Sequence, residues 1–151
     1  MIRSERRATF ELAPDAVWAV LEQVRAYPSW WPWLRTFDGT LLAPGERWAC
    51  TVRPPLPYQV SFEVLLRDVE PLRSIGADIS GDISGTARIE LSPTIAPTGG
   101  AGTHLHLVSE LAPERPLLRG LTAVTSAIPR YGHDQILDRA IEQFIARLPT
   151  A

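Results

Sequence analysis

The sequence predicts an α+β domain in which a curved antiparallel sheet of about seven strands wraps around a long C-terminal helix. Segments in which apolar and polar residues alternate, as in strands with one buried face, occur at the start of the chain and again between about residues 34 and 111. Two short helical patterns follow the first strand, and a long helical pattern ends the chain. Because one helix cannot cover so many strands evenly, we expect the sheet to curl around it and leave a space between them.

The first strand is predicted in the segment RRATFELAP, residues 6–14. Its apolar residues Ala8, Phe10 and Leu12 alternate with polar ones, which is the period of a half-buried strand. The inward face of this strand therefore belongs to the predicted core.

An amphipathic helix is predicted from Pro14 to about Val24. Proline suits the first turn of a helix, and Asp15 places a carboxylate at the positive end of the helix dipole. Apolar residues then follow at helical spacing. The pair Tyr27-Pro28 is expected to end the helix, since the residue before proline disfavours helical backbone angles. A short, irregular helical stretch is expected next.

Strand and turn patterns then alternate as far as residue 111. Turn-forming residues mark the connections, because glycine, proline and aspartate favour tight turns. The expected elements are two strands joined by a turn at 43–45, a strand within 58–69, a hairpin around Gly81-Asp82, and a last strand at 103–111.

The segment from Pro116 to Leu148 is helical in pattern and broken near Pro129, since proline interrupts a helix interior. Its second half carries a stripe at three- and four-residue steps, which is expected to face the sheet. The stripe consists of His133, Leu137, Ala140, Ile141, Phe144 and Leu148.

Length and composition narrow the class of protein. A chain of 151 residues suits a single domain, 1–151, with one core. The formal net charge of -2 and the absence of basic runs give no support for nucleic-acid binding. The single cysteine, Cys50, excludes an internal disulfide and a cysteine-based metal cluster. No apolar run approaches the ~20 residues of a membrane span. We therefore expect a cytoplasmic protein without a cofactor.

The aromatic segment, Tyr27–Trp33 (YPSWWPW), holds three of the chain's 5 tryptophans and two prolines. Two interpretations are open. The indoles could close one end of the fold as core, since each buries ~150–250 Å². Alternatively, Trp31 and Trp33 could form the wall or lid of an apolar ligand site. Because adjacent side chains cannot all point inward, at least one tryptophan is expected at the rim.

Strand alternation also indicates what would line a space beneath the helix. The inward-facing positions are almost entirely apolar, and only Cys50 and Ser109 carry polar atoms. This lining favours an apolar or flat aromatic ligand and offers little to stabilise charge, which weighs against catalysis. The candidate ligand-binding residues are Trp31, Trp33, Trp48, Cys50, Phe62, Val64, Ile79, Ile89, Leu107, Ser109, His133, Leu137 and Phe144.

The histidines are weak candidates for chemistry. His104 and His106 have the spacing of two metal ligands on one strand face, but the alternation places them on the convex side, so no metal site is expected. His133 stands at the start of the helical stripe. It could be an ordinary helix-start residue, a polar anchor for a ligand, or a general base. It is the only catalytic candidate.

This order of elements resembles the START-like or SRPBCC superfamily, whose helix-grip fold includes polyketide cyclase/dehydrase-like proteins and lipid carriers. The resemblance rests on a strand ending in Ala13-Pro14, on Val17-Trp18 in the helix, and on the pattern Tyr27-Pro28-x-Trp30-x-Pro32. It implies a cavity between the sheet and the last helix. Trp31 replaces the polar residue common in the family, which implies a more apolar rim.

Three functions remain open. The leading expectation is a carrier or binder of a small hydrophobic molecule, either lipid-like or aromatic, in that cavity. The second is an enzyme of the polyketide cyclase/dehydrase kind in which a group such as His133 assists proton transfer. The third is an interaction protein with a filled cavity. The protein is expected to be a monomer or a homodimer.

Overall fold

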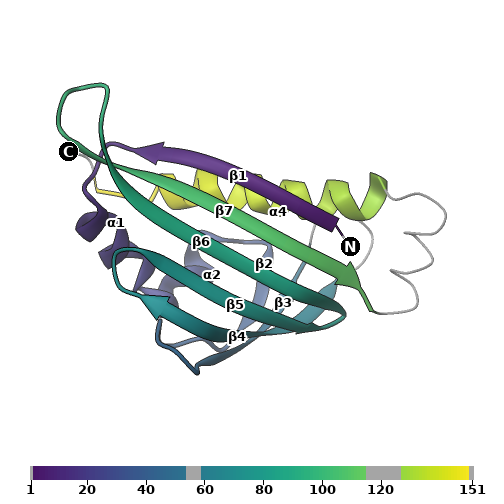
Figure 1. Cartoon of the computed structure of the whole chain (residues 1–151). Coiled ribbons are helices and arrows are strands. Elements are labelled where there is room, and N and C mark those ends of the chain that lie inside the picture. Colours follow the sequence, from purple (N-terminus) through teal and green to yellow (C-terminus); the bar gives the residue numbers. More distant parts are fainter. Residues whose placement is uncertain (1, 54–58, 115–126, 150–151) are drawn as a thin grey trace.

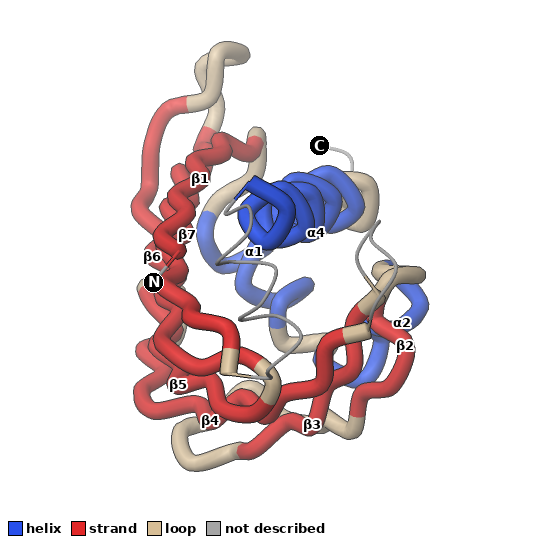
Figure 2. Tube along the Cα trace, turned by 90° about the vertical axis from the view of Figure 1, so that its right-hand side faces the viewer, coloured by secondary structure: helices blue, strands red, loops and turns tan. Residues whose placement is uncertain are grey.

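The described residues form one seven-stranded antiparallel sheet that curls around a helix. The computed structural model describes residues 2–53, 59–114 and 127–149, with side chains for all of these except 127–133. The strand order is β1-β7-β6-β5-β4-β3-β2, so β1 and β2 are the two edges (Figure 1). The predicted fold class is confirmed, including the sheet curled around a C-terminal helix (Figure 2).

The N-terminal elements differ from the prediction at their boundaries. Strand β1 spans Ile2–Phe10 and begins earlier than expected. Helix α1 spans Pro14–Leu21 and is followed by a 3-10 turn, η1, at Val24–Ala26. The expectation that Tyr27-Pro28 ends a helix is wrong, because helix α2 covers Tyr27–Trp30. Proline is tolerated there since first-turn N–H groups have no helical partner.

The remaining strands follow the predicted alternation of strands and turns. The hairpin around Gly81-Asp82 is confirmed, with β5 paired to β6 across it. The last strand, β7, pairs with both β6 and β1, so the first and last strands of the chain are neighbours in the sheet. The strands are β2 (Leu34–Phe37), β3 (Arg47–Val52), β4 (Val60–Glu70), β5 (Ser74–Gly81), β6 (Ile83–Ile95) and β7 (Ala101–Pro113).

Helix α4, Ala127–Ile145, lies inside the curl, with β1 on one side and the α2–β2 segment on the other (Figure 2). Pro129 falls in its first turn, where the missing N–H needs no partner. The part of the predicted helix between residues 116 and 126 lies outside the described residues. Phe144, on α4, is buried and packs edge-to-face on Phe10 of β1 at 5.7 Å between ring centroids.

The core sits where α1, α2 and α4 meet the concave face of the sheet. Its buried side chains include Val17, Trp18, Trp30, Leu66 and Phe144. In the part of the chain that the structure describes, no helix combines the length and apolar character that crossing a membrane requires.

Candidate functional site

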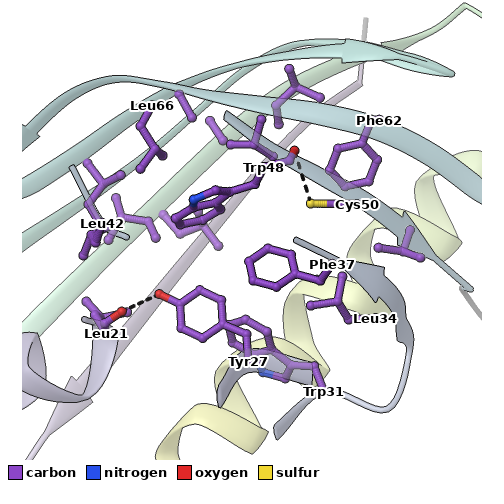
Figure 3. Close-up of a pocket in the computed structure, with 18 of the residues that line it drawn as sticks. Leu21, Tyr27, Trp31, Leu34, Phe37, Leu42, Trp48, Cys50, Phe62 and Leu66 are labelled. Atoms are coloured by element: carbon purple, nitrogen blue, oxygen red, sulfur yellow. Dashed lines mark hydrogen bonds between the residues drawn. The ribbon is translucent and has the colours of Figure 1, made fainter. Parts of the chain in front are cut away.

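An apolar cavity of about 260 Å³ lies between the concave face of the sheet and the aromatic segment (Figure 3). Strands β2 to β7 supply most of its wall, and α1, the aromatic segment and the loop between β2 and β3 supply the rest. The volume lies near the lower end of the range of small-molecule sites. A small ligand is therefore the kind of molecule that this space suits.

The structure brings nine of the thirteen predicted site residues together on the cavity wall. They come from the aromatic segment and from five strands, so they converge only in the folded chain. These nine are Trp31, Trp33, Trp48, Cys50, Phe62, Val64, Ile79, Ile89 and Leu107.

The other four predicted residues do not lie on the described wall of this cavity. Ser109 is buried on β7, and Phe144 belongs to the packed core rather than to the cavity. Leu137 is half-buried on α4 and likewise does not line this cavity. The side chain of His133 lies outside the described residues, although its backbone is part of α4.

The apolar wall residues that were not among the predicted contacts include Tyr27, Phe37 and Leu42. Tyr27 was interpreted as the end of a helix, Phe37 is the last residue of the short edge strand β2, and Leu42 lies in the loop that follows this strand. Four residues are too few for alternation to identify an inward face. The aromatic character of residues 27–37 was the available signal.

Tyr27 stands at the centre of an aromatic cluster at this end of the cavity (Figure 3). Its ring centroid lies 4.8 Å from that of Trp31, 5.7 Å from Phe37 and 5.9 Å from Trp48. Phe37 and Trp48 are themselves edge-to-face at 5.5 Å. The Tyr27–Phe37 pair is stacked and the others are tilted or edge-to-face. Offset-stacked and edge-to-face pairs at such distances are favourable arrangements of aromatic rings. The cluster is therefore a rigid wall.

The polar atoms of these rings are bonded to backbone and so do not face the cavity as free donors. The Tyr27 hydroxyl donates to the carbonyl of Leu21 at 2.5 Å, and Trp48 Nε1 donates to the carbonyl of Leu41 at 3.1 Å. Burial raises the pKa of the Tyr27 hydroxyl above its ordinary value, so this donor stays protonated. The cavity consequently meets carbon surface at this end.

The tryptophans of the aromatic segment divide between two environments. Trp30 is buried in the core, whereas Trp31 and Trp33 are half-buried and line the cavity. The last two also hold α4: Trp31 Nε1 donates to the carbonyl of Ala140 at 3.2 Å, and Trp33 Nε1 donates to Gln143 Oε1 at 2.9 Å. Within the segment, Trp30 thus belongs to the core, and Trp31 and Trp33 belong to the cavity wall.

Cys50 places a buried thiol on the wall. Its Sγ contacts the carbonyl of Trp48 at 3.7 Å. Burial, with a smaller contribution from the charge of Asp38, raises the pKa of the thiol to about 12. At neutral pH the thiol is therefore protonated, and a protonated thiol is a poor nucleophile.

A polar cluster, consisting of Ser4, Arg6, Asp134 and Asp138, joins β1 to α4 on the concave side. Ser4 Oγ donates to Asp134 Oδ1 at 2.6 Å, and Arg6 Nε donates to Asp138 Oδ1 at 2.6 Å. Arg6 Nη2 also lies 3.6 Å from Asp134 Oδ1. The hydrogen bond to Asp138 raises the pKa of the Arg6 guanidinium above its ordinary value.

Sequence reasoning did not find this cluster. It placed the start of the first strand near residue 6, whereas β1 begins at Ile2. Once the strand is extended, Ser4 and Arg6 share the inward face with Ala8 and Phe10.

The other two histidines lie in β7, on positions that alternate with the wall residue Leu107. His106 Nε2 lies 2.6 Å from Glu5 Oε2, and this hydrogen bond is the largest cause of a lowered pKa of the Glu5 carboxyl. Within residues 2–53, 59–114 and 127–149, no group of three or more histidine, cysteine or acidic side chains is arranged to hold a metal ion.

Comparisons with known proteins agree with the fold. A family model described as polyketide cyclase / dehydrase and lipid transport matches residues 1–148. No curated protein matches the sequence. A START superfamily protein from Mycobacterium smegmatis has a similar structure, with a TM-score of 0.72 and 12% identity over 97% of this chain and 96% of the other.

Two further structures with functional names are similar in fold. The Zhui aromatase/cyclase from Streptomyces sp. R1128 has a TM-score of 0.72 and 16% identity, over 97% of this chain and 93% of that one. Truncated norcoclaurine synthase from Thalictrum flavum has a TM-score of 0.62 and 12% identity, over 95% and 91%. At such identities the likeness concerns the fold alone.

Proposed function

The chain belongs to the polyketide cyclase / dehydrase and lipid transport family, and from that premise we propose that it binds or carries a small hydrophobic molecule in the cavity beneath the aromatic segment. The family match and the similar structures confirm the START-like resemblance found in the sequence. The ligand that we propose is lipid-like or aromatic.

The observation that carries this proposal is the open, carbon-lined volume between rigid aromatic rings. The nine predicted residues on its wall are the proposed ligand contacts. A flat ligand that buries about 200 Å² of apolar surface there would gain about 5 kcal/mol. Aromatic faces such as those of Trp31 and Trp48 add favourable ring contacts. An open volume also favours this function over that of an interaction protein with a filled cavity.

A cyclase or dehydratase is the second candidate, because such enzymes share the family name. It would require a proton acceptor close to the substrate. On the described wall, the only titratable groups besides Arg88 are the protonated Cys50 thiol and the Tyr27 hydroxyl, which already donates to Leu21. The wall therefore favours carriage. His133 remains the proposed base of the alternative.

A fluorescence titration with N-phenyl-1-naphthylamine, a neutral aromatic probe, tests the proposal. Ala87 lies on the cavity wall, and its neighbour Thr86 is exposed on the same strand. Ala87→Leu should fill part of the cavity and abolish probe binding. Thr86→Leu places the same leucine side chain on the opposite face, so it should leave probe affinity unchanged.

Equal probe affinity in Ala87→Leu and the wild type would show that the cavity is not the binding site. Mass spectrometry of molecules that co-purify with the protein then separates the two functions. A ligand that is recovered unchanged after incubation indicates carriage, whereas loss of water from it indicates a dehydratase or cyclase.

A further inference from the structure

The covering segment, residues 39–42 in the loop between β2 and β3, lies between the cavity and solvent. The side chain of Leu42 lines the cavity (Figure 3), whereas its neighbour Leu41 is 58% exposed. Thr40 is exposed as well, and Gly39 is buried. An outward movement of this segment would therefore open the cavity to solvent at Leu42.

Within the described wall, the covering segment is the part that hydrogen bonds hold least. Wall residues in the strands belong to the continuous ladders of the sheet. The aromatic segment is fixed by backbone hydrogen bonds and by the two indole bonds to α4. Residues 39–42 make no backbone–backbone hydrogen bond to any described residue. Their one hydrogen bond to the described chain joins Trp48 Nε1 to the carbonyl of Leu41 at 3.1 Å.

Both ends of the covering segment are anchored to the sheet. On one side, Asp38 N–H donates to the carbonyl of Ala49 at 3.3 Å, and Asp38 Oδ1 accepts from the N–H of Ala49 at 2.6 Å. On the other side, Gly45 N–H donates to the carbonyl of Leu66 at 2.7 Å. Gly45 has a φ of 86°, a backbone angle that favours glycine. The segment can therefore move between fixed ends without breaking a ladder of the sheet.

The bond between Trp48 and Leu41 is a weak closure of this segment. It lies in an exposed position, so both groups can bond to water when it breaks, and its net contribution is small. If a ligand enters only while the segment is open, the observed rate of entry is reduced by the fraction of open molecules. Removal of this one bond should raise that fraction.

We propose that the covering segment is the gate through which the ligand enters and leaves the cavity, and that the hydrogen bond between Trp48 and Leu41 is its latch. Trp48 then has two roles, since its ring is part of the wall and its N–H holds the gate closed. This inference rests on the proposed function, because a gate needs a ligand in the cavity. It adds a kinetic property: the latch limits how fast the ligand exchanges.

Stopped-flow measurement of N-phenyl-1-naphthylamine binding tests the latch. Trp48→Phe keeps an aromatic ring on the wall and removes the N–H that bonds to Leu41. The association rate constant should rise about two- to tenfold, the factor that corresponds to the loss of one hydrogen bond. Loss of wall contact alone acts mainly on the dissociation rate constant. Faster association is therefore the readout that a merely structural role of Trp48 would not produce.

Trp33→Phe is the matched control. Trp33 also lines the cavity, but its indole N–H bonds to Gln143 of α4 and not to the covering segment. This variant loses a similar part of an indole from the wall. Its probe should dissociate faster because contact area is lost, whereas its association rate constant should match that of the wild type.

A second pair of variants tests the covering segment without changing the wall. Leu41→Gly and Leu41→Ala remove the same exposed side chain, and neither changes a residue that lines the cavity. Only glycine adds backbone freedom to the segment. The glycine variant should therefore bind and release the probe about two- to fivefold faster than the alanine variant.

Three results would overturn the gate. The first is an association rate constant that is the same in Trp48→Phe and the wild type. The second is an equal acceleration of association in Trp33→Phe, and the third is equal rates in the two Leu41 variants. In each case bound probe would still support the cavity as a ligand site. Failure of the wild type to bind the probe would instead remove the proposed function and the gate with it.

Discussion

The two edges of the sheet both reach α4, but they hold it with different chemistry. At the β1 edge, Arg6 forms ion pairs with Asp134 and Asp138 near the start of the described helix. At the β2 edge, the indoles of Trp31 and Trp33 donate neutral hydrogen bonds to its second half. The curled sheet is therefore closed over one helix by charge on one side and by aromatic rings on the other.

This difference indicates how each side should respond to its surroundings. Ion pairs between partly exposed groups weaken as salt screens their charges, over a Debye length of about 10 Å at 0.1 M and about 3 Å at 1 M. Neutral hydrogen bonds and ring contacts are not screened in this way. The β1 edge should thus be the salt-sensitive side of the fold, and the aromatic segment the salt-insensitive side.

Phe144→Ala should have the largest effect, because Phe144 contacts both sides. Its ring centroid lies 5.7 Å from that of Phe10 on β1 and 6.2 Å from that of Trp30 on α2. Truncating a buried phenylalanine should lower the free energy of unfolding by about 3–5 kcal/mol, as measured by chemical denaturation. The adjacent Ile145→Ala is the control, since Ile145 is 45% exposed. A loss below about 2 kcal/mol for Phe144→Ala would mean that the packing of Phe144 does not connect β1 to α2.

Arg6→Met should have the next largest effect. It removes the guanidinium that pairs with Asp134 and Asp138, and it leaves these two carboxylates without that positive charge. We expect a loss of about 1.5–3 kcal/mol in the free energy of unfolding, the range for hydrogen bonds to charged groups. The loss should shrink in 1 M NaCl. Arg67→Met serves as control, because the Arg67–Asp78 pair is exposed and such pairs contribute at most about 1 kcal/mol. A loss that is unchanged by salt would contradict the ionic character of this edge.

Alkaline pH should destabilise the fold through Cys50, which lies on the cavity wall near the aromatic segment. The folded-state pKa of the Cys50 thiol is raised from 9.0 to about 12, so the folded state keeps its proton where the unfolded state loses it. Its stabilising contribution is complete below pH 9 and is lost as the pH rises toward 12. Between pH 9 and 10 the free energy of unfolding of the wild type should fall more steeply than that of Cys50→Ala, by up to about 1.4 kcal/mol per pH unit. Parallel curves in pH-dependent denaturation would show that the thiol is not protected by the cavity wall.

Trp33→Phe should have the smallest effect, because Trp33 is only half-buried and the change keeps an aromatic ring while it removes the N–H that bonds to Gln143 and a small part of the indole. We expect a loss of about 0.5–1.5 kcal/mol that is the same at low and high salt. Gln143→Leu completes a double-mutant cycle. If Trp33→Phe costs as much in the Gln143→Leu background as in the wild type, this bond does not hold α4.

The fold was predictable because strand alternation and turn residues are local signals. The hairpin around Gly81-Asp82 and the inward face that includes Phe62, Ile89 and Leu107 follow directly from a period of two. The helix boundary at Tyr27-Pro28 was not predictable in this way. Proline disfavours the helical region for the preceding residue, but it also suits a first turn, and only the packed chain selects between them.

The candidate site was predictable on its sheet side and not on its helix side. Wall residues such as Trp48 and Val64 are specified by strand parity. The place of Phe144, in contrast, depends on how α4 is rotated and tilted within the curl, and a helical stripe at three- and four-residue steps leaves that open. Arg6 was missed for a related reason, since its partners lie on α4 and no local pattern connects them.

The pairing of β1 with β7 also has a consequence during synthesis of the chain. Ile2 pairs with Leu111, and the bond between Ser4 and Asp134 joins residues 130 positions apart. While the ribosome makes the intervening residues, β1 cannot yet pair with β7, and the inward-facing ring of Phe10 is not yet covered by Phe144. Contacts so distant in sequence slow folding, and an unpaired strand with an apolar face is prone to aggregate. We therefore expect β1 of the nascent chain to be prone to aggregation until most of the chain has left the ribosome.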